Sequence, residues 1–122
     1  MKKQSLVLGA SASPYRYSNR AIHMLRDQDE AVLALGRHTD TVRDVEILTE
    51  LKELPEGDID TITLYLNPGN QEEYKDWIIQ KKPRRVIFNP GSENMSFAKE
   101  LKEADIEPIF ACTLVMLRTQ QY

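Results

Sequence analysis

The chain has 122 residues, of which 41% are hydrophobic and 29% are charged, so residues 1–122 can bury a core as one domain. The formal net charge of -3 argues against binding to nucleic acid or to an anionic membrane, because both favour a basic protein surface. No apolar run approaches the roughly 20 residues of a membrane helix, and no signal-peptide cleavage site follows the N-terminus. The single Cys112 cannot form an internal disulfide. We therefore expect a cytoplasmic protein.

The chain opens with a short apolar strand, Ser5 to Leu8, which runs into a turn of small and hydroxyl residues. Gly9 and Ala10 would let the backbone approach a ligand closely, and the helix after the turn would offer free N–H groups to an anion. Arg16 adds a fork of donors that suits phosphate oxygens. The turn predicts a phosphate site, although the same turn also occurs as a plain strand-to-helix connection.

A helix of about ten residues should follow the turn, with Ser18 as its N-cap. Its inner face would consist of Ala21, Ile22 and Leu25. Glu30 to Leu35 is apolar enough to be a strand buried on both faces, which is typical of parallel sheets. Val45 to Leu48 would be a short third strand.

The second half of the chain repeats this alternation. Ile59 to Leu66 predicts a strand rich in β-branched and aromatic residues. Asn70 and Glu73 have the spacing of a capping box, so we expect a helix that begins at Asn70 and ends near Lys82. The remaining expected elements are a strand at Arg85 to Phe88, a helix with Phe97, Ala98, Leu101 and Ala104 on its inner face, and a strand at Pro108 to Cys112.

Alternating strands and helices with right-handed crossovers predict an α/β fold: a doubly wound, mostly parallel Rossmann-like sheet with helices on both faces. Ligands of such folds bind at the carboxyl ends of the strands. The loop after the second strand would meet the ribose of an adenine nucleotide, where NAD-binding proteins have Asp or Glu. This chain has Arg37 there, which suits a ribose with an extra phosphate, as in NADP or coenzyme A (CoA). A solvated surface charge is the alternative interpretation of Arg37.

Five segments in this order resemble the small, single-domain CoA-binding proteins, whose fold is similar to the N-terminal CoA-binding domain of succinyl-CoA synthetase α subunits. The segments are Gly9 to Ser18, Leu35 to Arg37, Leu64 to Pro68, Phe88 to Asn94 and Cys112 to Leu117. One departure is the exit of the second strand, which is usually Asn-Pro-Lys in that family. Here Leu35-Gly36-Arg37 keeps only the cation.

The resemblance implies a site for CoA or acyl-CoA, with CoA as the cofactor. The residues carried over are Gly9, Ala10, Ser11 and Ser13 along the pyrophosphate turn, Arg16 and Ser18 on phosphate oxygens, Arg37 facing the 3′-phosphate, and Leu66, Asn67 and Pro68 beside the adenosine or pantetheine. Alternatively, Ser11 and Ser13 only shape the turn and Ser18 only caps the helix. Asn89 to Asn94 would either form part of the pocket wall or be an ordinary turn.

No catalytic residue and no metal site are expected. His23 and His38 lack partners at metal-ligand spacing, and Cys112 is interpreted as a buried structural thiol rather than a partner of the CoA thiol. The preferred function is CoA or acyl-CoA binding without catalysis. The alternatives are an NADP-dependent oxidoreductase, or a non-catalytic subunit that works with an acyl-CoA ligase partner. The apolar segment Leu114 to Leu117 would either form a homodimer contact or complete the core.

Overall fold

The computed structural model describes residues 3–122 and contains one mixed sheet. The strands are β1 (Gln4–Ala10), β2 (Ala31–Gly36), β3 (Asp40–Val42), β4 (Val45–Leu48), β5 (Thr61–Leu64), β6 (Arg85–Phe88) and β7 (Glu107–Phe110). They are ordered β3-β4-β2-β1-β5-β6-β7, and all neighbours are parallel except β3 and β4. The predicted α/β fold with a doubly wound, mostly parallel sheet is confirmed.

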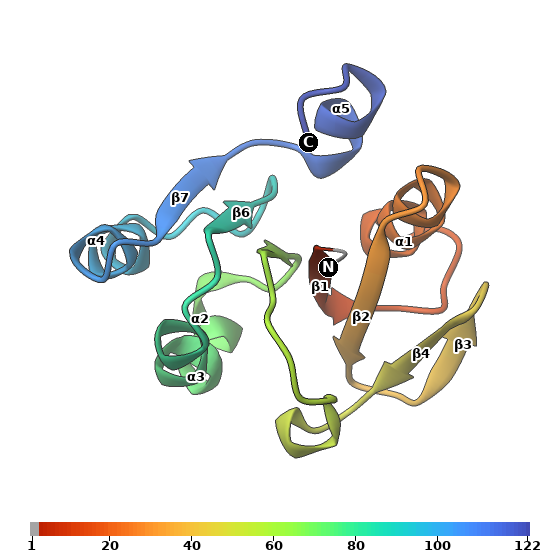
Figure 1. The fold of residues 1–122 in the computed structure, drawn as a ribbon, viewed down its shortest axis with the longest axis horizontal. Coiled ribbons are helices and arrows are strands. Elements are labelled where there is room, and N and C mark those ends of the chain that lie inside the picture. The colour runs from red at the N-terminus through yellow and green to blue at the C-terminus, as the bar shows by residue number, and fades with distance from the viewer. Residues whose placement is uncertain (1–2) are drawn as a thin grey trace.

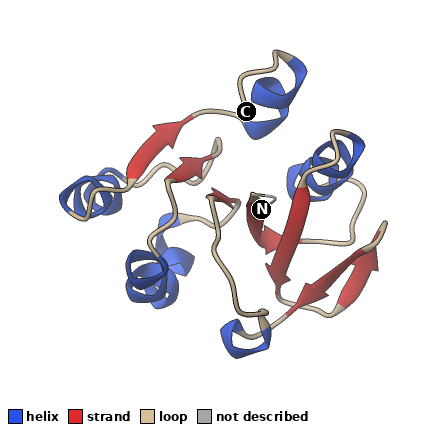
Figure 2. Cartoon of the chain, viewed as in Figure 1, coloured by secondary structure: helices blue, strands red, loops and turns tan. Residues whose placement is uncertain are grey.

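Helices cover both faces of the sheet (Figures 1 and 2). The α-helices are α1 (Tyr17–Asp27), α2 (Pro68–Gln71), α3 (Lys75–Lys81), α4 (Met95–Glu103) and α5 (Thr113–Arg118), and the 3-10 helices are η1 (Leu51–Glu53) and η2 (Glu72–Tyr74). α1 and α5 pack on one face, whereas α3 and α4 pack on the other. None of the helices within residues 3–122 combines the length and the apolar character needed to cross a membrane.

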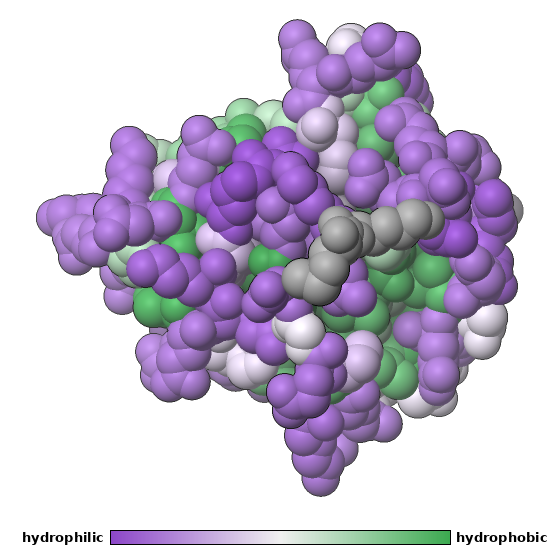
Figure 3. Space-filling view, viewed as in Figure 1, coloured by the Kyte–Doolittle hydropathy of each residue, from purple (hydrophilic) through white to green (hydrophobic). Residues whose placement is uncertain are grey.

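Two hydrophobic cores follow from the alternation of side chains along β1. Leu6 and Leu8 point into the core under α3 and α4, while Val7 points into the core under α1 and α5. All three side chains are at most 1% exposed, so β1 is buried on both faces, as its continuous apolar sequence predicts. On the face seen in Figure 3, the protruding parts are mostly hydrophilic and hydrophobic residues show in the recesses between them.

The direction in which strands are added to the sheet reverses between β1 and β5. After β1 the chain adds β2, β3 and β4 on one side of it, with β3 at the edge. It then returns to β5 on the other side of β1 and adds β6 and β7 outward from there. In doubly wound folds, the crevice at the carboxyl ends of such neighbouring strands is where ligands bind. The topology therefore favours a ligand site at the loops after β1, β2 and β5.

Several predicted boundaries are wrong for local reasons. Strand β3 was not expected; it pairs with β4 through a turn at Arg43 and Asp44, and Arg43 adopts a positive φ of 59° without the glycine or asparagine that usually signals such a turn. The helix expected at Asn70 begins earlier, because Asn67 is the N-cap of α2 and Pro68 occupies its first turn. β5 is shorter than Ile59 to Leu66, since Tyr65 and Leu66 already belong to the following loop.

The C-terminal segment also differs from the expectation. β7 ends at Phe110, and Cys112 is the N-cap of α5 rather than a strand residue. Leu117 of α5 is buried in the core beside α1, whereas Val115 is 50% exposed. β7 is an edge strand of the sheet, and its Pro108 pairs with Val86 of β6.

Candidate functional site

Three loops meet at the carboxyl edge of the sheet. The turn after β1 is next to the exit of β2, because Ala10 pairs with Gly36, and next to the exit of β5, because Leu8 pairs with Leu64. A side chain on Gly36 would collide with the carbonyl oxygen of Ala10, so glycine is required for this approach. Arg37, which follows Gly36, is thereby placed beside the predicted phosphate turn.

Gly9 holds the turn against β5. Its φ of +96° lies in the left-handed region that glycine tolerates best. A Cβ atom at Gly9 would lie 3.0 Å from both carbonyl atoms of Tyr65 and 3.1 Å from Leu66 Cδ2. The absence of a side chain therefore lets the backbone after β1 cross closely over the end of β5.

Hydrogen bonds within the chain set the shape of the turn. The backbone N–H of Ser13 donates to Ser11 Oγ at 3.0 Å, and the backbone N–H of Arg16 donates to the Ser13 carbonyl at 3.1 Å. Asn19 Nδ2 of α1 donates to the Ser11 carbonyl at 3.1 Å. Ser11 thus shapes the turn, and its hydroxyl is engaged with the backbone.

The first helix starts one residue before Ser18, so Ser18 is not its N-cap. Arg16 has extended backbone angles (φ -87°, ψ 140°) and takes the N-cap position without a side-chain cap. Ser18 lies inside α1 and is only 3% exposed, while Arg16 is exposed. The first N–H groups of α1 therefore have no capping side chain, which suits an anion at this helix end.

Arg37 is exposed in the bend after β2 and forms no ion pair with another residue in the range 3–122. It lies near Tyr74 of η2. Burial and the charge of Glu73 raise the pKa of the Tyr74 phenol, and the positive charge of Arg37 opposes that rise. A free guanidinium at this place is available to a ligand phosphate.

The loop after β5 is held by amide side chains. Asn67 Oδ1 accepts a hydrogen bond from the Asn70 backbone N–H at 2.9 Å, and the Leu66 carbonyl accepts one from Gln71 Nε2 at 2.9 Å. Gln71 is fully buried, and its Nε2 also donates to the Ser92 carbonyl at 2.8 Å. Gln71 therefore joins the loops after β5 and β6, a role that its place in a polar sequence segment did not indicate.

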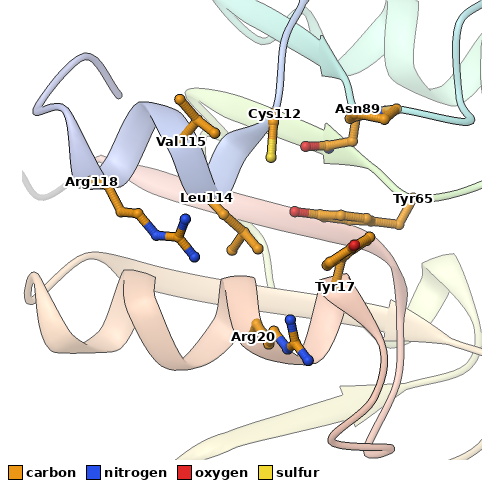
Figure 4. Close-up of a pocket in the computed structure, with 9 residues that line it drawn as sticks. Tyr17, Arg20, Tyr65, Asn89, Cys112, Leu114, Val115 and Arg118 are labelled. Carbon is orange, nitrogen blue, oxygen red and sulfur yellow. The ribbon is translucent and has the colours of Figure 1, made fainter.

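A cavity of about 390 Å³ opens between α1 and α5, beside the end of the phosphate turn (Figure 4). Its volume falls within the range of about 300–1,000 Å³ that is usual for small-molecule sites. Its lining comes from α1, from the loops after β5, β6 and β7, and from α5: Tyr17, Arg20, Tyr65, Asn89, Pro90, Cys112, Leu114, Val115 and Arg118.

Asn89 fixes the floor of this cavity. Its Nδ2 donates to Thr63 Oγ1 at 2.7 Å and to the Leu64 carbonyl at 2.8 Å, and its Oδ1 accepts from the Thr113 N–H at 2.8 Å. Asn89 thereby links β5, the end of β6 and the start of α5. Of the segment Asn89 to Asn94, which was expected to form either part of the pocket wall or an ordinary turn, Asn89 and Pro90 line this cavity.

Tyr65 presents a buried hydroxyl to the same cavity. Burial raises the pKa of Tyr65 to about 12, so the phenol remains a hydrogen-bond donor at neutral pH. The hydroxyls of Thr63 and Thr113 oppose this rise in pKa, and they bond to each other at 2.8 Å. Within residues 3–122, Tyr65 Oη has no hydrogen-bond partner.

Comparison with known families agrees with this geometry. Residues 3–118 match a family model described as the CoA binding domain. The chain belongs to this family. No curated protein matches it closely enough to count as a relative.

Solved structures extend the comparison of this CoA binding domain. A crystal structure of an uncharacterized protein is 38% identical, covers 100% of this chain and 99% of its own, and has a TM-score of 0.92. A protein from Thermus thermophilus is 24% identical, with coverage of 99% and 91% and a TM-score of 0.85. A dinucleotide-forming acetyl-coenzyme A synthetase from Ca. Korarchaeum cryptofilum is 10% identical and has a TM-score of 0.73; the match covers 89% of this chain and 25% of that one. The last two show the fold alone.

Sequence reasoning did not single out Tyr17, Arg20 or Arg118 in this CoA binding domain. Arg20 follows Arg16 by about one helical turn, which is a weak local signal. No sequence signal pointed to Arg118, because the helix that carries it was not expected. Cys112 is partly exposed at the cavity rather than fully buried. Among the described residues, no cluster of three or more His, Cys, Asp or Glu side chains is arranged to hold a metal.

Proposed function

We propose that this protein binds CoA or acyl-CoA at the carboxyl edge of its sheet, with the pyrophosphate on the turn after β1. The observation that carries the proposal is the pairing of Ala10 with Gly36, which brings Arg37, a guanidinium without an ion pair among residues 3–122, beside that turn. A nucleotide with phosphates at both its pyrophosphate and its ribose would meet both features. Membership of the CoA binding domain family supports CoA as that nucleotide.

The proposed contacts follow the residues of the three loops. Gly9, Ala10, Ser11 and Ser13 would line the pyrophosphate, with Arg16 and the uncapped start of α1 as the donors. Arg37 would bind the 3′-phosphate, and Leu66, Asn67 and Pro68 would border the adenosine or pantetheine. Ser18 is the weakest of the proposed contacts, since it is almost completely buried in α1.

The proposal assigns binding and no reaction to this chain. The 25% of the acetyl-coenzyme A synthetase that it resembles in fold suggests one setting for such a domain. In that setting, the CoA binding domain would hold the coenzyme for an acyl-CoA ligase partner. A complex with such a partner is a part of the proposal that copurification would test separately.

Isothermal titration calorimetry with CoA, dephospho-CoA, NADP and NAD tests the binding proposal. CoA is expected to bind more tightly than dephospho-CoA by about tenfold, as a charge-assisted phosphate contact of about 1.5 kcal/mol would give. Arg37→Ala should abolish this difference, whereas Lys99→Ala, at an exposed position of α4, should keep it. Binding of NADP without CoA would overturn the proposal in favour of a dinucleotide enzyme.

A further inference from the structure

The cavity between α1 and α5 and the position of Arg37 lie on opposite sides of the phosphate turn. Arg37 follows β2, whereas the cavity is formed at the ends of β5, β6 and β7, and β1 stands between these two groups in the sheet. The cavity also begins immediately beyond the turn, because Tyr17 follows Arg16. If the nucleotide end of CoA lies toward Arg37, the thiol end and any acyl group are directed toward the cavity.

The cavity carries positive charge in an acidic protein. Its lining includes Arg20 and Arg118 and, among the described residues, no Asp or Glu. Neither guanidinium forms an ion pair within residues 3–122; Arg20 only lies over the Tyr17 ring, at 5.6 Å from its centroid. Figure 4 shows Arg118 reaching from α5 toward the space between those helices, while Arg20 lies along α1 near Tyr17. Two unpaired guanidinium groups on facing helices favour an anionic ligand.

Other arginines of the protein, unlike Arg20 and Arg118, are paired with carboxylates. Arg26, Arg43 and Arg84 each form an ion pair with an aspartate, at 2.8 to 2.9 Å. With a net charge of -3, the chain does not lack carboxylates that could pair with Arg20 and Arg118. The two arginines at the cavity are left for a charge that comes from outside the chain.

The inner part of the cavity suits a neutral carbonyl and a short carbon chain. Within residues 3–122 the buried Tyr65 hydroxyl has no hydrogen-bond partner, and a thioester carbonyl oxygen would be an acceptor for it. Leu114 and the Cys112 side chain supply apolar surface beside it, as Figure 4 shows. The cavity thus combines a buried hydrogen-bond donor, the Tyr65 hydroxyl, with two exposed positive charges.

We infer that this cavity selects acyl-CoA molecules whose acyl group ends in a carboxylate, which Arg20 and Arg118 bind together. The inference rests on the proposed CoA function and adds the class of acyl group to it. Tyr65 would donate to the thioester carbonyl, so the acyl chain would run from Tyr65 toward the two arginines. The step is binding only, and no bond is formed or broken.

Calorimetry with pairs of acyl-CoA molecules of equal carbon number tests the inference. Malonyl-CoA is compared with propionyl-CoA, and glutaryl-CoA with pentanoyl-CoA, so that the carboxylate is the main difference within a pair. We expect at least one carboxylated member to bind about tenfold or more tightly than its neutral counterpart. Because both arginines are exposed, this preference should shrink as the salt concentration rises.

Variants assign the preference to the two arginines. Arg20→Gln combined with Arg118→Gln should abolish it while leaving the affinity for CoA itself within about twofold. The matched control, Lys99→Gln combined with Lys102→Gln, removes two exposed positive charges from α4 and should keep it. An equivalent gain when free malonate or glutarate is added to CoA would assign the site to free carboxylates and overturn the inference.

The outcomes separate the inference from the proposed function. If CoA binds but neither carboxylated thioester is preferred, the inference is wrong and the CoA proposal stands. If the preference survives the double arginine variant, the carboxylate is bound elsewhere and the inference is also wrong. If no CoA compound binds, the proposed function is wrong and the inference fails with it.

Discussion

Gly9 packs directly against Tyr65: a methyl group on Gly9 would lie 3.0 Å from the carbonyl carbon and oxygen of Tyr65. Tyr65 also donates its backbone N–H to the Leu8 carbonyl at 2.8 Å, so the two segments cannot separate easily. This contact joins the phosphate turn to the residue whose hydroxyl faces the cavity. Crowding at Gly9 would therefore disturb both parts of the proposed CoA site.

Gly9→Ala should destabilise the fold by about 2–4 kcal/mol, because it combines a strained positive φ with a backbone clash. Gly91→Ala is the matched control, since Gly91 has nearly the same φ of +97° but nothing within 4 Å of an added Cβ. Gly91→Ala should lower the free energy of unfolding only by the backbone strain, about 1–2 kcal/mol. Urea denaturation measures both. If the two variants lose the same free energy of unfolding, the backbone at Tyr65 moves aside to accept the added methyl group at little cost.

Asn89→Ala should destabilise the protein by about 2–4 kcal/mol, because it removes three buried hydrogen bonds to β5 and α5, among them the one that the Thr113 N–H makes. Asn70→Ala serves as the control, since the structure uses the backbone N–H of Asn70 and no side-chain hydrogen bond of Asn70 occurs within the described residues. The free energy of unfolding from urea titrations compares the two. A loss at Asn89 no larger than at Asn70 would contradict the role of this amide.

The carboxylate of Asp60 should make the fold sensitive to acid. Arg84 donates to it at 2.9 and 3.1 Å, and this pairing, with the Thr61 hydroxyl, holds the pKa of Asp60 below its ordinary value despite partial burial. A carboxyl whose folded pKa lies below its unfolded value of about 3.9 stabilises the fold fully above that value and loses this contribution as pH falls through the folded pKa.

Asp60→Asn should therefore lower stability at pH 7 and reduce the further loss between pH 5 and about pH 3. The urea midpoint at several pH values measures this. Glu103→Gln, at an exposed position of α4, controls for the removal of one negative charge. If Asp60→Asn and the unmodified protein lose the same stability on acidification, another carboxyl group governs the acid response.

Cys112 offers a direct test of where the thiol end of CoA lies. It is the single cysteine of the chain, is partly exposed and lines the cavity, so a thiol reagent reports on this place alone. Saturating acyl-CoA should slow alkylation of Cys112 by iodoacetamide about tenfold or more, whereas free adenosine 3′,5′-bisphosphate should protect it much less. Equal protection by both compounds would place the acyl end outside the cavity.

The fold and the sharp turn after β1 were predictable because their signals are local. The unbroken apolar run of β1 indicates a strand buried on both faces, and Gly9 is a residue that an abrupt change of direction favours. The cation at Arg37 was likewise visible from its place after a predicted strand. These features depend on neighbours in the sequence, so one chain was enough to find them.

The cavity was not predictable, because its charged residues meet only through packing. Arg20 and Arg118 come from α1 and α5, which lie far apart in the sequence and are joined by Gln28, the C-cap of α1, whose Nε2 donates to the Leu117 carbonyl at 2.9 Å. The start of α1 was misjudged for a related reason. Ser18 is a favourable N-cap residue, but the bond from Asn19 to Ser11 helps to fix the backbone so that the helix begins at Tyr17.

Pro108 makes the edge of the sheet at β7 unfavourable for the addition of another strand. The Glu107 N–H donates to the carbonyl of Arg84, just before β6, and the Ala111 N–H donates to Phe88 of β6, so the alternation along β7 turns the nitrogen of Pro108 outward, away from the sheet. A proline is harmless to the existing ladder at that position, yet it offers an incoming strand no donor. Another polypeptide that tried to add itself beside β7 would lack a hydrogen bond at its centre, which protects the open margin from aggregation by strand addition.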